Sequence, residues 1–381
     1  MKCIFISTTF NPENSVYQYY KSLGQEFLIH KYRVVYIFDQ LPKNIPENSE
    51  DLKYYIWPSK RPTRIKDFLF LRKLLKKYKP TYCITTFGSV NIMILTSYFY
   101  RVNNRIAWIR TTQSQILKDS KNRLKSKLLV YRKIFIYYLS TQIYANSEGA
   151  KQDSINGFNI NNDKISVLHN LKKKTKIKFK PKENRDFSIV IVGRLDKSKG
   201  HNILFKQFKT VLVKYPNLKL NVIGTGILSD DLKKLVSELE LTENIIFLGK
   251  IPPRLIGGYF SKNLIGISSS HSEAFGWVNI ESLNEGTPII STQTEGAKAI
   301  LQPHINGEFF YHNNQNSLLS AIERIFSNWD KYSLGAIKTF DDNFNLESVI
   351  KLHSNKILNH PPMQTNANTS NHCTSLKKED L

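Results

Sequence analysis

The chain has 381 residues, more than one ordinary hydrophobic core organises, so two domains are expected. Hydrophobic residues make up 41% and charged residues 23%, which is typical of a soluble globular protein, and no apolar run is long enough to span a bilayer. The net charge of +24 predicts attraction to phosphorylated ligands, an anionic membrane surface or nucleic acid, or it reflects a chain rich in Lys, Ile and Asn throughout.

The cysteines and the N-terminus indicate the compartment. Cys3, Cys83 and Cys373 are odd in number and scattered, so they fit neither a disulfide framework nor a zinc site. Residues 1–10 read as a short strand, because their apolar run is too brief for a signal peptide. A reducing cytoplasm is therefore expected.

The first half of the chain alternates strand-like and helix-like patterns, which predicts a parallel, doubly wound α/β sheet. The expected strands are residues 2–6, 33–37, 82–85, 106–110, 142–145 and 165–168, and the expected helices are residues 16–30 and 65–79. Residues 172–185 are basic with little periodicity, which is typical of an interdomain linker.

The second half restarts the same rhythm. Its expected strands are residues 188–192, 219–223, 245–247, 264–268 and 289–291, and its expected helices are residues 201–215, 230–239 and 315–327. The prediction is two Rossmann-like domains that face each other across a cleft. Their expected bounds are 1–170 for an acceptor-binding domain, 171–186 for the linker, 187–345 for a donor-binding domain, 346–360 for a final helix that is a candidate to return to the first domain, and 361–381 for a disordered tail.

The loop after the strand at residues 188–192 contains Gly193, Arg194, Lys199 and Gly200. Glycines let a backbone approach an anion closely, and the two cations supply charge for a diphosphate. The following helix would add its positive N-terminal end. The alternative is a solvated basic loop in a basic protein.

A second glycine turn lies at Gly224 and Gly226, after another expected strand. It resembles the start of a dinucleotide fingerprint, but Ser229 stands where the third glycine would be. A tight turn between strand and helix is the favoured interpretation.

Two carboxylates, Glu273 and Glu281, lie eight residues apart around an Ala-Phe-Gly turn and a helix-like stretch. One carboxylate can accept hydrogen bonds from both hydroxyls of a ribose, and the other can accept from sugar hydroxyls. The alternative is a pair of ordinary solvent-facing acids.

Basic residues precede an apolar, aromatic stretch in residues 118–139. This pattern suits a helix that lies on an anionic bilayer, and residues 65–79 are of similar character. The alternative is a basic outer face over an ordinary core.

Taken together and in register, these motifs resemble the retaining family 4 glycosyltransferases of the GT-B fold. The matching segments run from about residue 187 to 310 and comprise Gly193-Arg194-Leu195, Lys199-Gly200, residues 222–226, residues 246–249, the Glu273 to Glu281 segment, Gly286-Thr287-Pro288 and Asn306-Gly307. The resemblance implies an enzyme that transfers a sugar with retention of anomeric configuration.

The resemblance also implies roles for individual residues. Arg194 and Lys199 hold the donor diphosphate, and with Glu273 they form the catalytic set. Glu273 and the backbone of Phe275 and Gly276 contact the transferred sugar. Glu281 takes the ribose, Ile251 lies against the nucleobase, and Gly193 and Gly224 complete the donor site. No Asp-x-Asp motif occurs, so no metal or other cofactor is expected.

The N-terminal half departs from the family pattern in two places. Residues 9–15 replace a glycine-rich loop, and residues 108–114 stand where the family often has a histidine. Arg110, Thr111 and Gln113 are the candidate substitutes on the acceptor side.

The expected partners are a UDP- or GDP-sugar and a glycan or lipid-linked acceptor in surface polysaccharide synthesis, such as lipopolysaccharide, capsule or exopolysaccharide. The expected location is the cytoplasm, with the inner membrane face as a peripheral option. The alternatives are an epimerase, a sugar phosphorylase or a nucleic-acid-binding protein, none of which is accompanied by a motif, and a non-catalytic GT-B scaffold, which the missing histidine leaves open.

Overall fold

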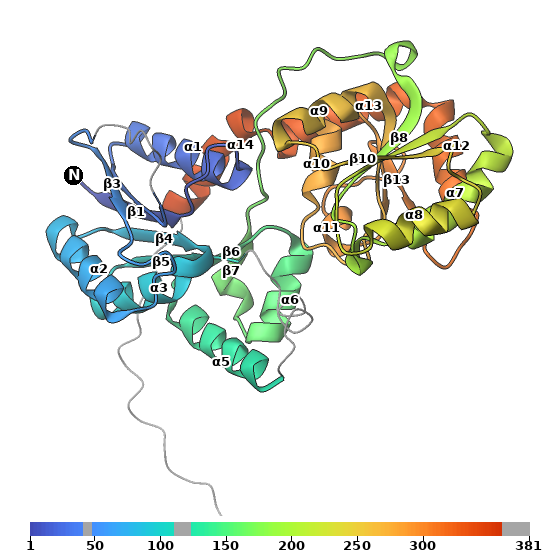
Figure 1. The fold of residues 1–381 in the computed structure, drawn as a ribbon. Helices are drawn as coiled ribbons and strands as arrows, with labels where there is room; N and C mark the ends of the chain where they lie inside the picture. Colours follow the sequence, from blue (N-terminus) through green and yellow to red (C-terminus); the bar gives the residue numbers. More distant parts are fainter. Residues whose placement is uncertain (41–47, 110–122, 360–381) are drawn as a thin grey trace, which may run out of the picture.

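The computed structural model describes residues 1–40, 48–109 and 123–359. Figure 1 shows two α/β domains joined by an extended linker, with the last helix returning from the second domain to the first. Each domain is built on one parallel sheet with helices on its faces, so the expected pair of Rossmann-like, doubly wound domains is confirmed.

The N-terminal domain has a seven-stranded sheet in the order β3-β2-β1-β4-β5-β6-β7. Its strands are β1 (Cys3–Thr8), β2 (Arg33–Phe38), β3 (Leu52–Ile56), β4 (Tyr82–Thr86), β5 (Asn104–Trp108), β6 (Gln142–Ala145) and β7 (Ile165–Val167). The strand order reverses between β1 and β4, so a ligand crevice is expected at the carboxyl ends of these two strands.

The helices of this domain are α1 (Ser15–Ile29), α2 (Ile65–Tyr78), α3 (Val90–Phe99), α5 (Arg123–Leu139) and α6 (Glu148–Phe158). Asn14 starts α1, because its side-chain oxygen accepts a hydrogen bond from the Val16 amide at 2.7 Å. Gly24 lets α1 pack closely on the sheet, since a Cβ there would lie 1.9 Å from the hydroxyl of Tyr36.

The C-terminal domain has a six-stranded sheet in the order β10-β9-β8-β11-β12-β13. Its strands are β8 (Asp186–Val192), β9 (Lys219–Ile223), β10 (Ile245–Gly249), β11 (Asn263–Ser268), β12 (Ile289–Thr292) and β13 (Gly307–Phe310). Its helices are α7 (His201–Lys214), α8 (Ser229–Glu238), α9 (Pro253–Lys262), α10 (Trp277–Asn284), α11 (Glu295–Lys298), α12 (Ser317–Ser327) and α13 (Trp329–Asn343).

The last helix, α14 (Leu346–Leu358), packs on α1 of the first domain (Figure 1). Its Val349, Ile350 and Ile357 are buried in the same apolar cluster as the α1 side chains. His353 lies 3.0 Å from the hydroxyl of Tyr19, and this hydroxyl and the imidazole Nδ1 share a hydrogen bond. The chain therefore crosses between the domains twice.

The linker is held at both of its ends. Near its start, Lys172 forms backbone hydrogen bonds of 2.9 Å with both Phe344 and Leu346. Near its end, the buried guanidinium of Arg185 donates to the carbonyls of Phe260, Asn263 and Glu285 at 3.0 to 3.1 Å. The two crossing segments are thus tied to each other and to the C-terminal domain.

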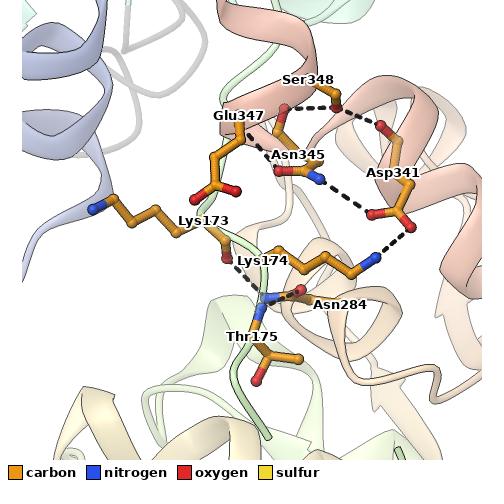
Figure 2. A network of polar contacts seen from close by, with 8 residues as sticks. All are labelled: Lys173, Lys174, Thr175, Asn284, Asp341, Asn345, Glu347 and Ser348. Carbon is orange, nitrogen blue, oxygen red and sulfur yellow. Dashed lines mark hydrogen bonds and ion pairs between the residues drawn. The ribbon is translucent and has the colours of Figure 1, made fainter.

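Figure 2 shows how the linker is fixed between α10 and the junction of α13 with α14. Asn284 accepts from the Thr175 amide at 3.0 Å and donates to the Lys173 carbonyl at 3.1 Å. Lys174 pairs with Asp341 at 2.6 Å, and Asn345 donates to the same carboxylate at 3.2 Å. This network holds Lys172 in place beside α10.

Two predicted elements extend into residues that the structure does not describe. The strand expected at residues 106–110 corresponds to β5 (Asn104–Trp108), and the amide of Ile109 still donates to the Tyr144 carbonyl on β6 at 2.8 Å. The basic and aromatic segment predicted at residues 118–139 contains α5, and its first residues lie outside the described part of the chain, which resumes at residue 123. Among the described residues, no helix has the length and apolar character needed to cross a membrane.

Candidate functional site

The largest of the cavities described here lies at the boundary between the domains and has a volume of about 830 Å³. One wall is the loop after β1, from Asn11 to Ser15, with the start of α1. The opposite wall comes from α9 and α10, and the linker forms the third side. Glu281, Glu285 and Trp277 line it from α10 and its C-terminal end.

Glu281 does not face open solvent within this cavity. Its carboxylate accepts a hydrogen bond from Lys172 at 3.0 Å, and both side chains are about one quarter exposed. Because Lys172 is anchored through its backbone, the pair holds the carboxylate in one direction. Lys172 is a site residue that the motif analysis did not identify.

Lys199 and Glu273 form a second ion pair, at 2.6 Å, although neither residue is among those that line the cavity of Glu281. The side chain of Lys199 also runs alongside Gly193, since a Cβ at Gly193 would lie 3.7 Å from it. Gly276, in the left-handed region with φ of 89°, starts α10 close to the Glu273 side chain. The structure therefore brings together Gly193, Lys199, Glu273 and Gly276.

Arg194 has a different position from Lys199. Its side chain is 78% exposed and its Nε lies 3.5 Å from Asp196. Because surface pairs of this kind contribute little to stability, the guanidinium is available to a ligand at small cost. The loop keeps its path through Gly200, where a Cβ would lie 2.2 Å from the Ser269 carbonyl oxygen.

Position 224 requires a glycine because a larger residue would not fit there. Its φ is 142°, and a Cβ there would lie 1.8 Å from the carbonyl oxygen of Gly193. The two glycine loops are therefore packed directly on each other. This contact agrees with the turn interpretation of the Gly224 segment.

Ile251 and Phe275 are held by packing against apolar and aromatic side chains. Ile251 packs with Val192 and Val278 around one apolar cluster, and Val278 lies one helical turn before Glu281 on α10. Phe275 is buried, with its ring near those of His169 and Phe344. The Phe275 side chain thus packs at the domain junction, and its backbone lies against Gly296, where a Cβ would be 2.5 Å from the Phe275 carbonyl oxygen.

The loop before α10, which contains Glu273 and Ala274, also contacts the N-terminal domain. The hydroxyl of Ser147, at the start of α6, donates to the Ala274 carbonyl at 2.7 Å. A Cβ at Gly149 would lie 2.2 Å from the Cβ of Glu295, so α6 and α11 are in close contact. These contacts place the Glu273 loop at the interface between the domains.

Glu285 is a second residue that the motif analysis did not identify. Burial raises the pKa of its carboxyl to about 7, although Thr175, Lys172 and Arg185 act in the opposite direction. Neutral and charged forms therefore coexist near neutral pH at one wall of the cavity.

We expect Glu285 to lower stability as the pH rises. A carboxyl whose pKa is raised by folding stabilises the protein fully below its unfolded pKa, and this contribution is lost as the pH passes the folded pKa of about 7. The loss is at most about 3 kcal/mol. Thermal unfolding of Glu285→Gln should therefore show a larger gain over wild type at pH 8 than at pH 5, whereas the exposed Glu243→Gln shows none. An equal gain at both pH values would contradict this.

The acceptor-side candidates Arg110, Thr111 and Gln113 lie outside the described residues. Across residues 1–40, 48–109 and 123–359, no cluster of three or more His, Cys, Asp or Glu side chains has the arrangement of a metal site.

Comparisons with known proteins show which proteins the chain is similar to. Residues 172–334 match the family model described as Glycosyl transferases group 1. An uncharacterised glycosyltransferase of Methanocaldococcus jannaschii is 26% identical over 276 residues, which cover 68% of this chain and 66% of that protein. A second glycosyltransferase of that organism is matched over 52% of its length, so the chain spans between half and two thirds of these relatives.

A longer match is to an enzyme of Campylobacter jejuni, the N-acetylgalactosamine-N,N'-diacetylbacillosaminyl-diphospho-undecaprenol 4-alpha-N-acetylgalactosaminyltransferase. It is 28% identical over 317 residues, 79% of this chain and 82% of that enzyme. Among solved structures, Anabaena Alr3699/HepE in complex with UDP-glucose has a TM-score of 0.66 at 13% identity, over 94% of this chain and 99% of that one. The structural likeness shows the two-domain GT-B fold, and residues 172–334, which lie in the linker and the C-terminal domain, match the group 1 glycosyl transferase model.

Proposed function

We propose that this group 1 glycosyltransferase moves a sugar, with retention, from a UDP- or GDP-sugar to a glycan or lipid-linked acceptor in surface polysaccharide synthesis. The observation that carries the proposal is that both motif carboxylates lie at the domain boundary in ion pairs, Glu273 with Lys199 and Glu281 with Lys172. A nucleotide sugar offers an anion to the lysines and hydroxyls to the carboxylates, so it can replace both sets of contacts.

The reaction would break the bond between the anomeric carbon and the diphosphate oxygen. Negative charge then grows on the departing diphosphate, where Lys199, Arg194 and the N-terminal end of α7 are preorganised to stabilise it. The acceptor hydroxyl would attack from the same side and give its proton to the leaving oxygen. This route accounts for retention without a carboxylate nucleophile.

The two cations also support a reaction without a metal cofactor. Lys199 and Arg194 come from one loop, and together they would neutralise the charge of a diphosphate. We therefore propose that turnover does not depend on a divalent ion.

A thermal-shift screen tests the donor and the metal together. UDP, GDP and their sugars would be added to the whole chain in EDTA, at about one hundred times the dissociation constant. Binding at that level stabilises a protein by about 2.7 kcal/mol, so one nucleotide series should raise the melting temperature by about 5 °C. A shift that appears only after Mg²⁺ is added would contradict metal independence. The absence of any shift in either condition would remove the proposal.

The surface of α5 supports peripheral membrane binding, with a location on the inner membrane face. Leu128, Tyr131, Phe135 and Tyr138 are spaced three or four residues apart and are 54 to 77% exposed. They form one exposed apolar stripe, called here the α5 stripe, and the exposed cations Lys127 and Arg132 accompany it. An apolar stripe beside cations fits an anionic bilayer surface.

Liposome flotation tests this part of the proposal. We expect the protein to float with vesicles that contain anionic lipid and to stay behind with neutral ones. Phe135→Ser with Tyr138→Ser should reduce flotation at least about tenfold, since each lost side chain removes about 1.5 to 3 kcal/mol of apolar burial. Leu334→Ser with Leu352→Ser, at equally exposed apolar positions on α13 and α14, is the matched control. Equal flotation with both lipids would contradict membrane binding.

A further inference from the structure

Two adjoining cavities lie at the carboxyl ends of the strands in the N-terminal sheet, apart from the cavity that holds Glu281. The first, of about 570 Å³, is lined by residues that end β1, β2, β3 and β4. The second, of about 370 Å³, lies between the end of β5 and α5. Arg61, Phe87 and Gly88 line both, so the two cavities are neighbours.

The first cavity contains buried hydroxyls whose hydrogen bonds are not made. Thr8 and Thr86 are 4% and 1% exposed, and neither hydroxyl has a hydrogen-bond partner within the described part of the chain. Such a group costs about 1 to 3 kcal/mol unless something bonds to it. Asp39 and Trp57 line the same cavity. Hydroxyls, a carboxylate and an aromatic ring together suit a saccharide, so this is called the hydroxyl cavity.

The second cavity is lined by cations. Arg61, Arg132 and Lys133 lie on its walls, and none of them forms an ion pair with another described residue. Burial, and then the neighbouring Arg132, lower the pKa of Lys133 to about 8. An anion bound among these side chains would relieve that repulsion. We call this the cationic cavity.

The hydroxyl cavity and the cationic cavity lie between the cavity that holds Glu281 and the α5 stripe. Thr9 lines the hydroxyl cavity, and Asn11, two residues later, lines the cavity that holds Glu281. On the other side, α5 carries Arg132 and Lys133 into the cationic cavity and also displays the α5 stripe. The spatial order is therefore the cavity that holds Glu281, then the hydroxyl cavity, then the cationic cavity and finally the α5 stripe.

We propose that the two adjoining cavities bind one acceptor, a saccharide joined to a phosphate or diphosphate group. The saccharide occupies the hydroxyl cavity, with one of its hydroxyls toward the donor, and the anion occupies the cationic cavity. This inference rests on the proposed function, because it assigns the acceptor of the same transfer. It adds that the acceptor must be anionic and names the side chains that bind its charge.

The test is calorimetric titration of the whole chain with inorganic pyrophosphate and with farnesyl diphosphate. Both titrations contain a saturating amount of the nucleotide, UDP or GDP, that binds the chain, so that the donor site is occupied. Wild type should bind at least one of these probes. Arg132→Gln with Lys133→Gln should weaken that binding at least tenfold, because two charge-assisted contacts are lost. Arg72→Gln with Lys73→Gln removes the same two charges from exposed positions on α2 that line neither cavity, and should bind like wild type.

The outcomes separate the two sources of the anion. Tighter binding of farnesyl diphosphate assigns the anion to a lipid-linked acceptor, and equal binding of the two probes assigns it to a phosphate without a lipid. No binding, or equal weakening by both double variants, overturns the proposal. Failure of the proposed function is distinguishable, because neither UDP nor GDP would then give heat with wild type in a separate titration.

Discussion

Replacing Lys199 with Ala is expected to lower kcat about a hundredfold to a thousandfold with a saturating nucleotide sugar. The loss of one preorganised donor to a developing oxyanion costs about 2.7 to 4 kcal/mol in the transition state. Lys199 lies 2.6 Å from Glu273 and beside Gly193, at the point where the resemblance places the leaving diphosphate. Steady-state rates of sugar transfer and of donor hydrolysis measure the effect.

A structural role for Lys199 would give a different result. Lys199 and Glu273 are each about one quarter exposed, so their pair should contribute no more than about 1 kcal/mol to stability. The melting temperature of Lys199→Ala should therefore stay close to that of wild type. Lys197→Ala, at an exposed position in the same loop, is the control and should keep its rate. A variant of Lys199 with normal turnover would remove it from the catalytic set.

Replacing Glu281 with Ala is expected to raise the KM for the donor about tenfold to a hundredfold. A carboxylate that accepts from ribose hydroxyls makes hydrogen bonds worth about 1.5 to 3 kcal/mol each. Because the ribose is remote from the breaking bond, the effect on KM should exceed that on kcat. Glu238→Ala, an exposed glutamate on α8, is the control, and initial rates over a range of donor concentrations give both constants.

The result that contradicts this role is an unchanged KM for the donor together with a lowered melting temperature. Glu281 would then only hold Lys172 and the linker in place. Near-normal activity in both Lys199→Ala and Glu281→Ala would leave the donor site unassigned.

Strands with continuous buried runs were predictable from the sequence. All six residues of β1 are buried, and so are most residues of β8. Both strands therefore appear in the sequence as continuous apolar runs rather than as alternating apolar and polar residues. β3 was not predicted, because Leu52–Ile56 is an edge strand whose residues are only partly buried. α3 was not predicted either, since Val90–Phe99 is apolar on nearly every side and lacks a helical period.

The site was predictable only where one motif holds neighbouring residues together. The Glu273 loop, Gly276 and Glu281 follow each other on α10 and the turn before it, so their proximity follows from the chain. Lys172 reaches Glu281 from a distant segment, through a bridge to Asn345 that no local pattern indicates. The basic run at residues 172–174 was the only signal, and it reads equally well as a linker.

The acceptor side depends even more on tertiary structure. Thr8, Thr86 and Arg132 lie on β1, β4 and α5, and each is unremarkable in its own segment. The strand order places the ends of β1 and β4 next to each other, which brings Thr8 and Thr86 to the hydroxyl cavity, while Arg132 lines the adjoining cationic cavity. A sequence analysis without that order has no means of grouping them.

A crystal structure of the chain with UDP tests the central claim most directly. The account predicts that the Glu281 carboxylate accepts hydrogen bonds from the ribose hydroxyls, and that Lys199 and Arg194 contact the diphosphate. The Lys172 and Lys199 ion pairs seen here would be broken or shared with the nucleotide. A nucleotide bound elsewhere on the molecule, with both ion pairs intact, would contradict it.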